Sequence, residues 1–290
     1  MNVLTSTPTA DHGVTAPINP RRSASAFVRS ISAELIKVTR RRVVIGTGAA
    51  VAAVAVGGTA IGIAAAEPAD TAVRVPDELI TIPVLEQAGG GTALFAQTAG
   101  FMSAFLLAVL IAAVAGEFTR GTFRTMLLQQ PGRFRVLAGK VTALVGFMGV
   151  ATLVAEALSW ITARAMAPSQ DIDTAAWVSM DGLGAGLEDF GRAILFLVGT
   201  AVLATMIGVL ARSVPIGVGA GLVWAGPIEN IIGDSWDPGQ YWFPGLLLRA
   251  VISPGSTEVS TSRALITLAA YAVVAIGVTG YALRRRDVTS

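Results

Sequence analysis

Two carboxylates stand inside otherwise apolar stretches of this 290-residue chain, and they have the clearest potential for chemistry. Glu156 lies in the stretch 141–165, about 15 residues from its basic flank, which is roughly 22 Å along a helix. Glu229 lies in the stretch 214–232. Ionisable groups in such segments usually face a cavity or one another. One interpretation is that both line a pathway that favours cationic amphiphiles. The alternative is that each forms an ion pair, for example with Arg164 or Arg192, that fixes helix packing.

The residue types that most catalytic and metal sites need are missing. The chain has no cysteine and a single histidine, His12, which excludes thiol nucleophiles, thiolate metal sites and HExxH sites. Gly139-Lys140 lacks the upstream Gly and the following Ser or Thr of a phosphate-binding loop, and no GxSxG elbow occurs. We therefore expect no catalytic residue and no metal site, and no ATP hydrolysis by this polypeptide alone.

The elements that position these carboxylates are predicted to be membrane helices. Hydrophobic residues make up 53% of the chain and charged residues 14%, with a mean hydropathy of +0.66. A soluble domain has about 25% charged residues. A helix needs roughly 20 apolar residues to cross a hydrocarbon core of about 30 Å. Six stretches meet or approach this length: 43–66, 94–116, 141–165, 193–210, 214–232 and 265–283. The predicted fold class is an all-α membrane protein with six transmembrane helices.

Charge alternates between the segments that flank these stretches. Sixteen of the 21 basic residues lie before residue 43, within 117–140, at Arg212 or after residue 283, and most acids lie in the other segments. The positive-inside rule then places both termini in the cytoplasm. The heavy use of arginine, alanine and glycine is typical of a GC-rich bacterial genome, so we expect a multi-pass protein of a bacterial plasma membrane.

The residues before the first span fall into two parts. Residues 1–25 are rich in Thr, Pro and Ser without periodicity, which predicts a disordered cytoplasmic leader. Over 26–42, apolar residues recur at helical spacing, with cations elsewhere on the turn, which predicts an amphipathic helix in the membrane interface. A basic flank that only sets topology would explain the charges but not the apolar stripe. The stripe consists of Phe27, Ile31, Leu35 and Val38.

Three segments of this plan have competing or special interpretations. Residues 39–42 and the apolar run that ends at 64–66 resemble a twin-arginine signal with a cleavage site, although the run exceeds a signal core of about 7–15 residues. The fourth and fifth stretches are nearly continuous, and Arg212 with Pro215 favours a hairpin, since a charge at mid-bilayer is costly. The apolar segment 241–251 is too short to span and predicts short outer helices, re-entrant or interfacial, before the last span.

The cytoplasmic loop 117–140 is the most informative segment. It begins with an acid at the mouth of the second span, continues as a short helix with basic and apolar faces, and returns to the bilayer behind further cations. A helix with a basic and an apolar face is suited to docking on a soluble partner protein. The alternative is a loop that only satisfies the positive-inside rule and binds no partner, which explains the positive charge but not the apolar face. The residues expected to dock are Glu117, Arg120, Gly121, Thr122, Phe123, Arg124, Met126, Leu127 and Pro131.

These patterns resemble the permease subunits of ABC-2-type transporters over nearly the whole chain. That family often has a "G-E-x-x-x-G-T-x-R-x-x-L-x-x-P" loop, here Gly116, Glu117, Gly121, Thr122, Arg124, Leu127 or Leu128, and Pro131. An "E-x-x-K-x-x-x-x-R" pattern in an N-terminal helix is matched by Glu34, Lys37 and Arg42. A "G-R-x-x-x-x-K" pattern is approached by Arg133 or Arg135 and Lys140.

The resemblance implies an exporter of a drug, antibiotic, peptide or lipid-like substrate. The loop would contain the coupling helix, and a separate ABC ATPase subunit would bind ATP and Mg. Two permease chains, identical or related, would enclose the pathway in the lipid bilayer, and no nucleic-acid partner is expected. The glycine pairs Gly58/Gly62 and Gly217/Gly221 have the spacing of close helix contacts and are candidates for a dimer face.

Two other classes of protein fit a helical membrane chain. A membrane-integral enzyme acting on lipid-linked substrates would need a cluster of nucleophiles or acids at one membrane face, which the sequence lacks. An ATP-independent immunity or scaffold protein would need no coupling loop. An ATPase reading frame beside the gene would favour the exporter over both.

Overall fold

The regular structure of the described chain is helical. The computed structural model describes residues 20–66, 81–122, 132–254 and 258–285, and these contain no β-strand. Five helical stretches within them are long and apolar enough to cross a membrane: α2 (Arg41–Ala64), α7 (Arg133–Met166), α8 (Met180–Ala211), Val214–Gly233 and α12 (Thr261–Arg285). A sixth results if α4 (Gly90–Phe101) and α5 (Ser103–Thr119) form one bent span. The prediction of an all-α chain with membrane-length helices is confirmed, with five or six candidate spans.

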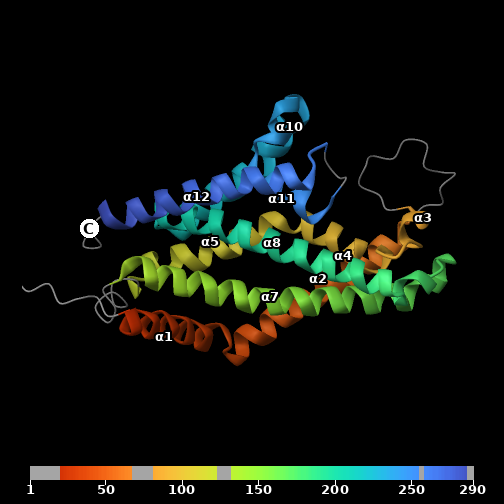
Figure 1. Cartoon of the computed structure of the whole chain (residues 1–290), viewed down its shortest axis with the longest axis horizontal. Coiled ribbons are helices and arrows are strands. Elements are labelled where there is room, and N and C mark those ends of the chain that lie inside the picture. The colour runs from red at the N-terminus through yellow and green to blue at the C-terminus, as the bar shows by residue number, and fades with distance from the viewer. Residues whose placement is uncertain (1–19, 67–80, 123–131, 255–257, 286–290) are drawn as a thin grey trace, which may run out of the picture.

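The long helices run side by side, as Figure 1 shows. α7 packs against α1 (Pro20–Val38), α2, α4 and α8, while α12 packs mainly on α8 and on α11 (Pro244–Ile252). α1, the start of α7 and the end of α12 lie at one end of the bundle, and α3 (Ile82–Leu85) lies at the other. We name the first of these the basic end, because Arg133 and Arg284 lie there.

The second predicted span, 94–116, is not one straight helix. The chain bends by 57° between α4 and α5, at Met102. Gly100 and Ser103 flank the bend, and Gly/Ser pairs are a common cause of helix kinks. Both halves are apolar, so the hydrophobic pattern gave no sign of the bend.

α7 begins earlier than the predicted span 141–165. It starts at Arg133 and has 34 residues, or about 51 Å, which exceeds a hydrocarbon core of about 30 Å. Glu117 belongs to α5 and Lys140 to α7, so the joining segment is shorter than the predicted loop 117–140. The arginines at the start of α7 end the apolar stretch, but they are good helix formers and do not end the helix.

The chain turns between α8 and α9 (Val214–Val223) at the position where the sequence predicts a hairpin. Arg212 adopts a left-handed conformation with φ of 51°, a common way to end a helix. Pro215 stands in the first turn of α9, where its missing N–H costs little. Further along, Pro227 interrupts the α-helical pattern within a π-helical turn, η4 (Trp224–Ile228), which α10 (Glu229–Ser235) follows.

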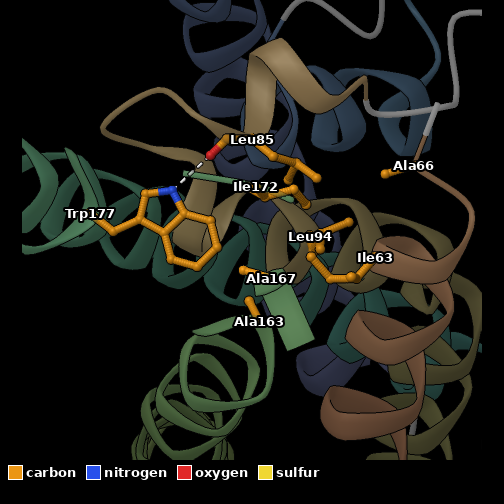
Figure 2. Close-up of a cluster of buried hydrophobic side chains, with 8 residues drawn as sticks. All are labelled: Ile63, Ala66, Leu85, Leu94, Ala163, Ala167, Ile172 and Trp177. Atoms are coloured by element: carbon orange, nitrogen blue, oxygen red, sulfur yellow. Dashed lines mark hydrogen bonds between the residues drawn. The ribbon is translucent and has the colours of Figure 1, made fainter. Parts of the chain in front are cut away.

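Short helices join the long ones. They include η2 (Ala167–Gln170), η3 (Ala175–Val178) and η5 (Asp237–Tyr241), in addition to α3 and α11. Figure 2 shows the apolar cluster that holds several of them together. In it the indole Nε1 of Trp177 donates a hydrogen bond to the Leu85 carbonyl at 2.7 Å, which ties η3 to α3.

α1 packs along the first turns of α7 through a face that differs from the predicted apolar stripe. Ser30 and Glu34 are buried, whereas Leu35 is exposed. This polar face is buried because its neighbour on α7 is Lys140, a charged partner. The placement of α1 in a membrane interface stays a prediction. Residues 1–19 and 286–290 lie outside the described residues, and they hold most of the predicted leader 1–25 and of the cytoplasmic tail that the sequence predicts over 284–290.

The two glycine pairs pack within the chain. A methyl group on Gly58 or Gly62 would collide with side chains of α4, and one on Gly217 or Gly221 would collide with Ile111 of α5. The glycines therefore allow helices of the same chain to approach closely. Their use as a dimer face, which the spacing alone indicated, is replaced by this internal role.

Candidate functional site: a buried charge cluster

Four charged side chains from three helices meet near the basic end. Lys140 of α7 donates to Glu117 Oε1 of α5 at 2.9 Å and to Glu34 Oε2 of α1 at 3.2 Å. Lys37 of α1 donates to Glu34 Oε1 at 2.5 Å, and its Nζ lies 3.8 Å from Glu117 Oε1. We name these four residues the charge cluster. It brings together positions up to 106 residues apart in the sequence.

The charge cluster is almost closed to solvent. Glu34, Glu117 and Lys140 are 2%, 5% and 6% exposed, while the Lys37 side chain reaches the surface. Two carboxylates and two ammonium groups balance in formal charge. Burying ions costs several kcal/mol each, and close opposite charges with additional hydrogen bonds offset that cost. Removing one of the three buried members therefore leaves a net charge in the interior.

The start of the loop folds back onto the charge cluster. Gly121 adopts a φ of 68°, which favours glycine because other residues are strained there. After this turn the Thr122 hydroxyl donates to Glu117 Oε2 and to the Glu117 carbonyl oxygen, the latter at 3.3 Å. Glu117 thus accepts bonds from Lys140 on one oxygen and from Thr122 on the other. The loop is attached to the cluster at its first residues.

Close approach of α1 to α7 depends on Gly139. A methyl group at that position would lie 2.5 Å from Ser30 Oγ and 2.7 Å from Ser30 Cβ, too close for the present packing. The Ser30 hydroxyl in turn donates to the Val136 carbonyl at 3.4 Å. This contact sets the distance at which the Lys140 ammonium can reach Glu34.

The structure brings together some of the predicted site residues and not others. Glu34, Lys37, Glu117 and Thr122 meet in or at the charge cluster, with Lys140 at the centre. Arg42 lies on α2 and is exposed, outside the cluster. Arg120 and Gly121 are exposed just beyond the end of α5. The remaining predicted docking residues lie outside the described part of the chain: Phe123, Arg124, Met126, Leu127 and Pro131.

Glu156 is buried in α7 away from the charge cluster. It is 6% exposed, and its Oε2 atom has no hydrogen-bond partner among the described residues. Arg192, one of the two ion-pair partners suggested by the sequence, instead binds Glu188 at 2.5 Å and Asp189 at 3.1 Å on its own helix. Arg164, the other, is exposed on α7.

Glu229 is buried and fully engaged. Its Oε1 accepts from the Trp224 indole at 2.5 Å, and its Oε2 accepts from the Leu246 backbone N–H at 3.2 Å. Leu246 stands in the first turn of α11, where unpaired N–H groups and the helix dipole favour a carboxylate. These contacts give Glu229 a structural role as a cap that fastens α10 to α11, in place of the ion pair that the sequence suggested.

Sequence reasoning missed three contributors to these sites. Ser30 and Gly139 set the α1–α7 distance, and Asp189 accepts from Thr92 of α4 at 2.6 Å. The glycine immediately before Lys140 was a usable signal, because a glycine next to a buried lysine leaves room for a neighbouring helix. Nothing in the sequence marks Ser30 or Asp189, since each is one of several serines or acids in its segment.

Comparison with known proteins identifies no relative. No protein-family model matches the chain, and a search of curated proteins finds no similar sequence.

Proposed function

We propose that this chain is the membrane-spanning permease subunit of an ABC exporter. A separate ATPase subunit, holding ATP and Mg, docks on the loop after α5, and a second permease chain completes the pathway. Both termini lie in the cytoplasm of a bacterium. The substrate is a drug, antibiotic, peptide or lipid-like molecule.

The charge cluster carries this proposal. All four of its members are residues that the three ABC-2-like patterns single out: Glu34 and Lys37 from E-x-x-K-x-x-x-x-R, Glu117 from the G-E-x-x-x-G-T loop and Lys140 from G-R-x-x-x-x-K. Thr122, which belongs to the same loop pattern as Glu117, donates a hydrogen bond to the Glu117 carboxylate. A loop that only satisfies the positive-inside rule needs no buried ions. Convergence of the three patterns in space is unexpected if each match were accidental.

The charge cluster could also transmit movement of the docked ATPase to the membrane helices. Replacing a whole buried ion pair by apolar residues is often neutral for stability, and in some proteins such pairs instead fix one defined arrangement of the helices. Here they join α1, α5 and α7, and Thr122 at the start of the loop bonds to them. A push on residues 118–122 by a docked ATPase would move the ends of these three helices together. Such rigid coupling is what an ATP-driven change of access requires.

Glu156 is the better supported candidate for the substrate pathway. A buried carboxylate whose Oε2 lacks a partner is costly in a purely structural role. An approaching cation would supply the missing interaction, which favours cationic amphiphiles as substrates. Glu229 is left out of the pathway because both of its oxygens are used within the chain.

Co-purification with an ABC ATPase encoded beside its gene tests the proposal. The tagged chain is extracted from membranes in mild detergent, and the bound ATPase is quantified. The double variant Arg120→Glu/Arg124→Glu should lower ATPase recovery by more than about tenfold, because like charges at an interface cost several kcal/mol. Arg40→Glu/Arg41→Glu makes the same change in charge at exposed positions of another segment, and it should leave recovery unchanged.

Size-exclusion profiles separate docking from folding. Both variants should elute as the wild type does, so that a loss of ATPase reports the interface alone. Equal ATPase recovery for wild type and Arg120→Glu/Arg124→Glu, with coupled ATP hydrolysis retained, would refute docking at this loop.

A further inference from the structure

A groove of about 740 Å³ opens at the basic end, between the start of α7 and the end of α12. Both of these helix ends lie at the same end of the bundle in Figure 1, and the two helices touch each other only slightly. The residues that matter for its chemistry are Arg133, Phe134 and Arg135 of α7 and Gly277, Gly280 and Arg284 of α12.

The rim of the groove is cationic. Arg135 and Arg284 are exposed, and Arg133 is held in place because its Nη1 donates to the Leu283 carbonyl at 2.8 Å. No acidic residue is among the described residues that line the groove. Three guanidinium groups without a counter-charge in the lining attract an anion, and the planar guanidinium matches the geometry of a phosphate.

The floor of the groove is apolar and open. A methyl group added to Gly277 or Gly280 would meet no described atom within 4 Å. Phe134 and Tyr281 beside them are 51% and 57% exposed, and the exposed face of α12 continues with Ile276. From Ile276 to Arg284 the helix rises about 12 Å, close to half of a hydrocarbon core of about 30 Å. The groove therefore joins an apolar surface to a cluster of cations.

We propose that this groove binds an anionic phospholipid, with its phosphate on Arg135 and Arg284 and its glycerol and upper acyl chains along Gly277 and Gly280. A free phosphate would use the cations and leave the apolar floor bare. A second copy of this chain, placed symmetrically on the same patch, would bring arginines against arginines. The lipid alone complements both parts, and the site does not depend on whether an ATPase docks at the loop.

Native mass spectrometry of the purified chain in detergent tests this site. The chain is titrated with phosphatidylglycerol, phosphatidylcholine or glycerol 1-phosphate. Phosphatidylglycerol should be retained in preference to both others. Each cation near an anionic headgroup contributes about fivefold in affinity. Arg135→Gln/Arg284→Gln should therefore weaken phosphatidylglycerol binding roughly 25-fold, while the control Arg164→Gln, at an exposed position near the other end of α7, should not.

A second variant tests the floor without changing charge. Gly280→Leu fills open space, so the chain should fold normally and should lose phosphatidylglycerol while keeping its arginines. Equal retention of both lipids, or unchanged binding in Arg135→Gln/Arg284→Gln, would overturn the site. If glycerol 1-phosphate bound as tightly as phosphatidylglycerol, the groove would be a site for small anions and not for a lipid. A change from dimer to monomer in Gly280→Leu, with lipid binding intact, would assign the groove to a second copy instead.

Discussion

The Lys140 ammonium of α7 donates to Glu117 Oε1 of α5 at 2.9 Å, and this bond is the centre of the charge cluster. The same ammonium also binds Glu34, so one cation holds two buried carboxylates from two other helices. The stability of the basic end should therefore depend on Lys140 more than on any exposed cation.

Lys140→Met should destabilise the protein by about 3–5 kcal/mol, because it leaves buried carboxylates without their partner. The measurement is unfolding by denaturant in mixed micelles. Lys37→Met removes a partly exposed cation of the same cluster and should cost clearly less. Adding Glu34→Gln and Glu117→Gln to Lys140→Met should recover part of the loss. Equal losses for the two lysine variants would show that the buried pairs do not hold the helices.

Gly139→Ala should push α1 away from α7. The added methyl group would collide with Ser30 Cβ, which a change of rotamer cannot relieve, and overpacking costs about 1–3 kcal/mol. Gly146→Ala is the matched control, because it lies on the same helix with open space around it. Since the chain has no cysteine, paired cysteines in α1 and α7 can report their separation by disulfide formation.

Restoring space should restore the packing. Ser30→Gly combined with Gly139→Ala should recover disulfide formation between the two helices. If Gly139→Ala and Gly146→Ala behave alike in both stability and cross-linking, the close approach of α1 at Gly139 is not a feature of the protein.

Gly121→Ala should weaken the link between the loop and the charge cluster. The left-handed backbone costs a non-glycine residue about 1–2 kcal/mol, and no crowding contributes. Gly121→Asn should cost less, because asparagine tolerates this conformation better. Thr122→Val removes the hydrogen bond to Glu117 without backbone strain, so it separates the two effects. The measurement is the ATPase activity of the reconstituted complex, and Gly121→Asn should be more active than Gly121→Ala. Equal activities, or a more active Gly121→Ala, would show that strain of the left-handed backbone is not the cause.

Glu156→Gln and Glu229→Gln should have opposite consequences. Glu229 accepts hydrogen bonds on both carboxylate oxygens, and an amide keeps only one acceptor oxygen, so its variant should lose about 1–3 kcal/mol of stability. Glu156→Gln should be neutral or stabilising, because Oε2 has no partner to lose. Thermal melting of both variants provides the comparison. The same Glu156 variant should transport cationic substrates more slowly, and unchanged transport of every cationic candidate would end its assignment to the pathway.

The sequence predicted the helical class and the approximate places of the long helices, because runs of apolar residues report burial in lipid. It could not place the bend at Met102 or the early start of α7, since both depend on backbone geometry and not on polarity. The sequence patterns identified Glu34, Glu117 and Lys140, but they did not predict that the three side chains are in contact. That contact joins residues on three helices, and a single sequence carries no information on which helices are neighbours.

Glu229 is the opposite case. A lone carboxylate in an apolar segment looks functional from sequence, and only the position of α11 shows what its oxygens bind. The residues around α11 carry no pattern that predicts this contact. Glu156, in a similar apolar setting, keeps an unpartnered Oε2.

Site-directed cross-linking from the loop to the ATPase is the most direct test of the proposed coupling. A single cysteine at position 120, introduced into this cysteine-free chain, carries a short photoreactive label, and a cysteine at the exposed Met180 serves as control. We predict a cross-link from position 120 to the ATPase whose yield changes when ATP is added, and no cross-link from position 180. Absence of any cross-link from position 120 in a complex that hydrolyses ATP would contradict the proposed coupling.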